Sequence, residues 1–82
     1  MPYTYILRCS DGTLYTGWTS DVERRLRAHQ AGKGSRYTRA RLPVTLAYCR
    51  EYATAREARQ REVAIQRLPR KEKLRLISST TS

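Results

Sequence analysis

The chain has 82 residues and a mass of 9.6 kDa, which is enough for one small domain with a thin core. Its 17 basic residues outnumber the 7 acidic ones and give a net charge of +10. No apolar run approaches the ~20 residues of a membrane span, and the first residues lack the pattern of a signal peptide, so we expect a cytoplasmic protein.

The positive charge is spread over the whole chain. Residues 1–41 carry 8 basic and 3 acidic groups, and residues 42–82 carry 9 and 4. Of the basic residues, 14 are Arg, whose planar guanidinium can bind a phosphate through two hydrogen bonds at once. This composition favours a polyanionic partner, and nucleic acid above others.

The cysteine and histidine content argues against a zinc site. Cys9 and Cys49 are far apart in the sequence, and His29 is the only histidine. We expect both cysteines to be small apolar residues of strands in a reducing compartment.

The N-terminal residues predict a β-hairpin. Residues 3–9 and 13–18 are rich in aromatic and β-branched side chains, and the Ser-Asp-Gly sequence at 10–12 is a turn signal between them.

The length of this turn decides where two tyrosines lie. A two-residue turn would place Tyr5 and Tyr15 on opposite faces of the hairpin. A three-residue loop with Gly12 in the left-handed bulge position instead pairs Tyr5 with Gly17 and Leu7 with Tyr15, so that both tyrosines share one face.

A helix is expected next, from Ser20 to about Gln30. Ser20 and Glu23 match the capping-box pattern at its start, and Gly32 is a natural stop after its end. Residues 31–41 then form a basic, glycine-bearing loop with room for one helical turn.

Pro43 ends this loop, and Val44 to Glu51 predicts a third strand. Thr54 and Glu57 match a second capping box, which opens a helix over residues 55–67.

Pro69 suits the first turn of a last short helix, which we expect to end near Ile77. The order β-β-α-β-α-α predicts an α+β fold, in which a small three-stranded antiparallel sheet is flanked by helices. We expect one domain over residues 1–77 and a flexible tail over residues 78–82.

The first helix is expected to point its histidine inward. Successive helical residues are rotated by about 100°, so Val22, Leu26 and His29 share one stripe and Arg25 lies at its edge. Two interpretations stay open. His29 is either a satisfied core histidine or a catalytic group, and Arg25 either extends to water or points to a phosphate.

The later helix places one carboxylate in its apolar stripe. Glu62 lies within the arc that Ala58 and Ile65 define. Because a buried bare charge costs several kcal/mol or more, we expect Glu62 to pair with a neighbouring Arg, to be neutralised or to bind a metal ion.

Taken together, these side chains suit hydrolysis of a phosphodiester. Tyr5 and Tyr15 offer hydroxyls that can accept a proton from water or orient it, although ordinary sheet packing is the alternative. Arg25 can offset charge on the phosphoryl oxygens. Glu62 can hold one Mg²⁺ or Mn²⁺ ion, whose remaining ligands are water and the substrate phosphate.

The basic loop supplies candidates for binding nucleic acid, although a solvated loop is the alternative. Phosphate contacts are expected there from Lys33, Arg36, Tyr37, Arg39 and Arg41.

Four features of the sequence follow one another at a characteristic spacing. They are Tyr-Thr-Tyr at 3–5, Tyr-Thr-Gly at 15–17, Asp-Val-Glu-Arg-Arg-Leu-Arg-Ala-His at 21–29, and Glu62 in a helix. In these features the chain resembles the GIY-YIG nuclease family, above all its small stand-alone bacterial members. The resemblance covers residues 3–77.

The resemblance implies a role for each of five residues. Tyr5 and Tyr15 would be the two motif tyrosines, one of which helps to activate water. Arg25 would be the catalytic arginine, and His29 would orient a tyrosine or the phosphate. Glu62 would bind the metal ion.

The resemblance also implies that Gly17 lets backbone approach closely behind the site. The chain departs from many family members in two ways that bear on catalytic efficiency. It contains no Asn, and Gln66 stands where relatives often have a Lys.

We therefore expect a metal-dependent endonuclease that hydrolyses DNA, with a role in DNA repair or processing. A monomer is compatible with that activity. One alternative is a nucleic-acid-binding module with a catalytically weak or inactive site, and another is an RNA- or ribosome-associated protein. Recognition by arginines and a basic loop predicts weak sequence preference and a steep salt dependence.

Overall fold

The computed structural model of the protein describes residues 1–79. Its elements follow in the order β1 (Tyr3–Arg8), β2 (Leu14–Thr19), α1 (Val22–Gln30), α2 (Arg36–Arg39), β3 (Thr45–Glu51), α3 (Ala55–Gln66) and α4 (Arg70–Ser79). The strands form one antiparallel sheet in the order β2-β1-β3, which confirms the predicted α+β fold. None of the helices in this described part has the length and apolar character that a bilayer crossing requires.

The hairpin has the three-residue loop that the sequence predicts. The Cys9 amide donates to the Thr13 carbonyl at 2.9 Å, and Gly12 has a φ of 84°. Tyr5 and Tyr15 consequently lie on one face of the sheet.

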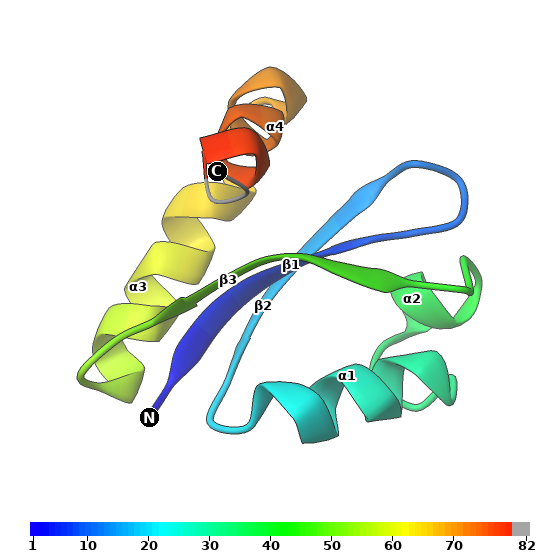
Figure 1. Ribbon diagram of the computed structural model, residues 1–82, viewed down its shortest axis with the longest axis horizontal. Coiled ribbons are helices and arrows are strands. Elements are labelled where there is room, and N and C mark those ends of the chain that lie inside the picture. Colours follow the sequence, from blue (N-terminus) through cyan, green and yellow to red (C-terminus); the bar gives the residue numbers. More distant parts are fainter. Residues whose placement is uncertain (80–82) are drawn as a thin grey trace.

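Helices cover both faces of the sheet (Figure 1). On the face covered by α1 and the loop through α2, one buried cluster consists of Tyr5, Leu7, Cys9 and Val44. On the face covered by α3 and α4, a second buried cluster consists of Ile6, Tyr48, Ile65 and Ile77. Because side chains alternate along β1, this central strand contributes to both clusters.

The start of α1 differs from the prediction. Asp21 is the N-cap, because its carboxylate accepts a hydrogen bond from the Arg24 amide at 3.1 Å. The Asp21 amide in turn donates to the Thr19 hydroxyl at 3.1 Å, and this local turn keeps Ser20 out of the cap position. The predicted capping box of Ser20 and Glu23 is therefore wrong.

The other helix ends follow the sequence more closely. Gly32, with a φ of 79°, follows the end of α1. The Thr54 hydroxyl accepts from the Glu57 amide at 3.2 Å and caps α3, as predicted. The α4 helix extends to Ser79, two residues past its predicted end, and the rest of the expected tail, residues 80–82, lies outside the described residues.

The two cysteines have different environments. Cys9 is buried in the first cluster, as expected, whereas Cys49 is exposed. Cys49 lies on β3, an edge strand in which Tyr48 alone is buried, so it is a strand residue as predicted but faces solvent.

Two buried threonines on the face covered by α3 have opposite hydrogen-bonding states. The Thr4 hydroxyl donates to the Ala58 carbonyl of α3 at 2.7 Å. Thr16 is only 5% exposed, and among residues 1–79 its hydroxyl has no hydrogen-bond partner. One hydroxyl therefore joins β1 to α3, while the other is buried without compensation.

This difference predicts opposite effects on stability. Thr16→Val removes an unsatisfied hydroxyl and keeps a β-branched shape, so we expect the free energy of unfolding to rise by about 1 kcal/mol. Thr4→Val removes a hydrogen bond and leaves a carbonyl with one partner fewer, so we expect a decrease of about 1 kcal/mol or more. Urea unfolding of both variants measures these changes, and equal decreases in the two variants would contradict the assignment.

Candidate active site

A buried pair, Tyr5 from β1 and His29 from α1, forms the centre of the candidate site. The Tyr5 hydroxyl and His29 Nε2 are 3.0 Å apart, and the two rings meet edge to face. Tyr5 is 3% exposed and His29 is fully buried. His29 reaches this position because it lies on the inward stripe of α1, which confirms the prediction from helical periodicity.

Burial determines the protonation of both groups. It raises the pKa of Tyr5; the nearby Arg25 guanidinium opposes this rise, and Tyr15 and Glu62 add to it. Burial, followed by the positive charge of Arg25, lowers the pKa of His29. At neutral pH, Tyr5 is therefore a neutral phenol and His29 a neutral imidazole.

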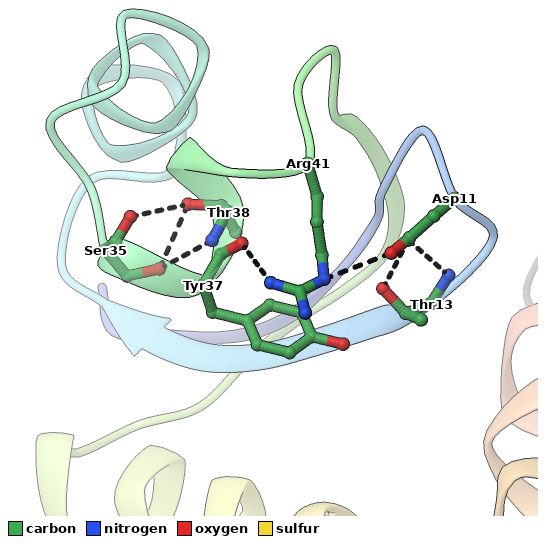
Figure 2. A network of polar contacts seen from close by, with 6 residues as sticks. All are labelled: Asp11, Thr13, Ser35, Tyr37, Thr38 and Arg41. Atoms are coloured by element: carbon green, nitrogen blue, oxygen red, sulfur yellow. Dashed lines mark hydrogen bonds and ion pairs between the residues drawn. The ribbon is translucent and has the colours of Figure 1, made fainter.

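The second ring nitrogen of His29 is also hydrogen-bonded. Its Nδ1 lies 2.8 Å from the Thr38 hydroxyl of α2, which lies 3.0 Å from the Ser35 hydroxyl. Ser35 is the N-cap of α2, and its side chain accepts from the Thr38 amide at 3.2 Å (Figure 2). A chain of hydrogen bonds thus runs from Tyr5 in the sheet to the loop that carries α2.

Two glycines make room for the buried pair. A Cβ at Gly17 would lie 2.5 Å from the Tyr5 hydroxyl, and a Cβ at Gly34 would overlap the His29 ring. Gly17 therefore provides space for the Tyr5 side chain rather than for an approaching backbone, which corrects the role that the resemblance implied.

Tyr15 continues the site toward the surface. Its ring centroid lies 5.2 Å from that of His29, and the Tyr37 ring stacks on Tyr15 at 6.0 Å with an interplanar angle of 28°. Tyr37 is 36% exposed, so the three rings form a column from the buried pair to solvent.

Arg25 is half-buried beside Tyr5. One of its guanidinium nitrogens donates to the Gly34 carbonyl at 3.0 Å and so holds the loop over His29. A guanidinium has five N–H groups, so those that bind neither Gly34 nor Tyr5 are available to a phosphate.

Glu62 comes from the other side of the sheet. It is half-buried on α3, and its charge raises the pKa of Tyr5, so the carboxylate lies within electrostatic reach of the phenol. The α3 helix packs against β2, the edge strand next to β1. Tyr5, Tyr15, Arg25 and His29 thus gather on one face of the sheet, whereas Glu62 lies on the other side and acts on Tyr5 through its charge.

The Glu62 carboxylate forms no ion pair with any residue in the described part of the chain. Within residues 1–79 the two ion pairs are Asp11–Arg41 and Glu72–Arg75, so the alternative in which Glu62 pairs with an Arg is not realised. Burial raises the pKa of Glu62, and the positive charge of Arg59 opposes that rise. A half-buried carboxylate in this state favours an added cation.

The site offers one carboxylate, that of Glu62, to a hard divalent ion. Nowhere in the described part of the chain do three His, Cys, Asp or Glu side chains gather as a metal site. A single carboxylate, completed by water and substrate phosphate, is a common way to hold Mg²⁺. Glu62 is the residue that would hold it.

The sequence model of the GIY-YIG catalytic domain matches residues 1–75. The chain belongs to the GIY-YIG family. A UPF0213 protein of Clostridium perfringens is 52% identical to it over 79 residues, which are 96% of this chain and 85% of that protein. A UPF0213 protein of Streptococcus sanguinis is 51% identical over 79 residues, with 96% and 91% covered.

Solved structures have the same fold. The solution NMR structure of a UPF0213 protein from Bacillus halodurans is 43% identical and superposes with a TM-score of 0.61, covering 95% of this chain and 84% of that one. A protein from E. faecalis, also solved by NMR, is 37% identical with a TM-score of 0.63, covering 96% and 84%. The chain is therefore similar to small proteins that carry the catalytic domain of a nuclease family.

Tyr15 lies next to the basic loop, because its ring stacks on that of Tyr37. Lys33, Arg36 and Arg39 in this loop are exposed. Arg41 differs, because its guanidinium pairs with Asp11 at 3.1 Å, donates to the Tyr37 carbonyl at 3.0 Å and lies over the Tyr37 ring (Figure 2). Arg41 thus connects the loop to the hairpin turn.

Three residues of the site were missed by sequence reasoning. Ser35 and Thr38 lie within a loop that was interpreted as a phosphate-binding segment, and Gly34 was interpreted as a loop glycine. The spacing of Ser35 and Thr38 is a short N-cap signal, but nothing local indicates that His29 lies beneath it.

The pKa values of Glu62 and Asp11 are shifted in opposite directions, so neutral variants of the two residues should change stability in opposite directions. Hydrogen bonds from Thr13 and the charge of Arg41 lower the pKa of Asp11, whereas burial raises the pKa of Glu62. At pH 7 we expect Glu62→Gln to raise the Tm slightly and Asp11→Asn to lower it.

The pH dependence of the two effects also differs. The advantage of Glu62→Gln should vanish as the pH falls through the raised folded-state pKa and Glu62 becomes protonated. The Asp11 contribution should persist at that pH and disappear only below the ordinary aspartate range. Thermal unfolding from pH 7 to about pH 2 measures both, and a large drop in Tm for Glu62→Gln at pH 7 would refute the unpaired carboxylate.

Proposed function

We propose that this GIY-YIG protein is a divalent-metal-dependent endonuclease that hydrolyses phosphodiester bonds of DNA, in repair or processing. The observation that supports the proposal most is the environment of the Tyr5 hydroxyl. A neutral imidazole lies 3.0 Å from it, and the charges of Arg25 and Glu62 both act on it. A buried phenol in such a setting is suited to acid–base chemistry.

In the proposed reaction Tyr5 activates the attacking water. The phenol oxygen accepts a proton from the water while the phenol hydrogen moves to His29 Nε2. The resulting hydroxide attacks phosphorus, the bond from phosphorus to the leaving oxygen breaks, and the leaving oxygen takes a proton from solvent. His29 then returns its extra proton to water, and both side chains regain their starting state.

Arg25 and Glu62 stabilise charge in this scheme. The guanidinium N–H groups of Arg25 that do not hold the loop donate to the phosphoryl oxygens as their negative charge grows. A divalent ion bound at Glu62 would supply further positive charge for the phosphate and the leaving oxygen.

Cleavage assays test this proposal directly. Labelled single-stranded, duplex and branched DNA are incubated with the wild-type protein in Mg²⁺, in Mn²⁺ and in EDTA. We expect cleavage of at least one substrate with metal and none in EDTA. Arg25→Ala should lower the rate by about 100-fold or more, and Glu62→Gln should abolish cleavage while DNA binding survives.

Glu72→Gln on the surface of α4 is the matched control and should cut like the wild type, since Glu72 forms only a surface ion pair with Arg75. A purified wild-type protein that binds DNA and cuts none of the three substrates would contradict the enzyme and leave a nucleic-acid-binding module.

The basic loop predicts a separable effect on binding. Alanine at Lys33, Arg36 or Arg39 should weaken DNA binding and lower the slope of log K against log salt by about 1 for each phosphate that the variant no longer binds. Arg41→Ala should instead lower the Tm, because this side chain joins the loop to the hairpin. Fluorescence anisotropy over a salt series, together with thermal unfolding, separates the two effects. Equal salt slopes for all four variants and the wild type would exclude the loop as a phosphate-binding surface.

A further inference from the structure

A chain of hydrogen bonds runs from Tyr5 to α2, and the surroundings of Tyr5 determine where the hydrogen of its hydroxyl points. The Tyr5 hydroxyl is buried, so its hydrogen needs an acceptor. Among residues 1–79, the acceptor within hydrogen-bond distance is His29 Nε2, and the neighbouring Arg25 guanidinium can only donate. His29 Nε2 must therefore present a lone pair to Tyr5.

The other end of the chain agrees with this direction. A neutral imidazole has one N–H, which must then be on Nδ1, and the Thr38 hydroxyl oxygen 2.8 Å away accepts it. The Thr38 hydrogen is directed to Ser35, whose carbonyl oxygen at 3.4 Å can only accept and whose hydroxyl lies at 3.0 Å. The hydrogens of Tyr5, His29 Nδ1 and Thr38 then each have an acceptor.

We propose that Thr38, held by the Ser35 cap, is a positioning residue for the nuclease reaction. Its hydroxyl binds the hydrogen of His29 Nδ1 and thereby reserves Nε2 to receive the phenol hydrogen of Tyr5. This inference rests on the proposed function, in which that hydrogen moves when water is activated. Thr38 contacts neither water nor phosphate in this scheme and acts only through His29.

The alternative tautomer shows why the position matters. With the hydrogen on Nε2, the imidazole would donate to the Tyr5 oxygen, and the buried phenol hydrogen would have no acceptor. Tyr5 could then accept no proton from water without forming a doubly protonated oxygen. One hydroxyl in the loop thus decides whether the pair can serve as a base.

Two variants of nearly the same size test this inference. Thr38→Val keeps the shape and removes the acceptor, whereas Thr38→Ser keeps a hydroxyl. His29 is the only histidine, so long-range ¹H–¹⁵N spectra report its tautomer without assignment ambiguity. We expect an Nδ1–H tautomer in the wild type and in Thr38→Ser, and a population of the Nε2–H tautomer in Thr38→Val.

Kinetics provide the second readout. In Thr38→Val we expect kcat for DNA cleavage to fall by about 10–100-fold with little change in KM, and Thr38→Ser to restore kcat to within several-fold of the wild type. An effect on folding alone would lower the Tm and leave kcat per folded molecule unchanged.

Each outcome decides a separate question. An Nε2–H tautomer in the wild type would overturn the inference, even if Thr38→Val fails to fold, and so would wild-type kcat in a folded Thr38→Val. An Nδ1–H tautomer in a wild-type protein that cuts no DNA would instead overturn the proposed function and leave the assignment of the hydrogens intact.

Discussion

The buried hydrogen bond between Tyr5 and His29 is the constraint on which the rest of the site depends. It joins the central strand to α1, and it requires empty space at Gly17 and Gly34 where any other residue would place a Cβ. It also requires neutral partners. Burial raises the pKa of Tyr5 and lowers the pKa of His29, so both groups are neutral at pH 7. The same contact that packs α1 on the sheet therefore prepares the pair for proton transfer.

The electrostatics of the molecule combine a large positive charge with a half-buried carboxylate, Glu62, that forms no ion pair within residues 1–79. The net charge of +10 suits attraction of a polyanion, yet no Arg or Lys in residues 1–79 pairs with Glu62. Burial disfavours the charged form of Glu62 in the folded chain, and the positive charge of Arg59 opposes this effect. A cation beside a bound phosphate would compensate the charge of Glu62. For this reason we expect Glu62→Gln to gain stability and to lose activity.

Much of this arrangement is predictable because it depends on local periodicity. The loop length at Gly12 sets the register that brings Tyr5 and Tyr15 to one face, and helical rotation places His29 and Glu62 on inward stripes. The cap of α1 was mispredicted, because a hydrogen bond between Thr19 and Asp21 competes with the local pattern at Ser20. The contact of Thr38 with His29 could not be predicted, because it forms only when the loop folds back over α1, and periodicity carries no information on such returns.

The charge state of His29 tests the central claim most directly. The single histidine can be followed by the ring C–H resonances of the wild-type protein in an NMR titration from pH 8 to pH 4.5. The structure predicts a midpoint below the ordinary value of about 6.5, because burial and the charge of Arg25 lower the pKa of His29. A midpoint at or above about 6.5 would contradict a buried neutral base beside Tyr5.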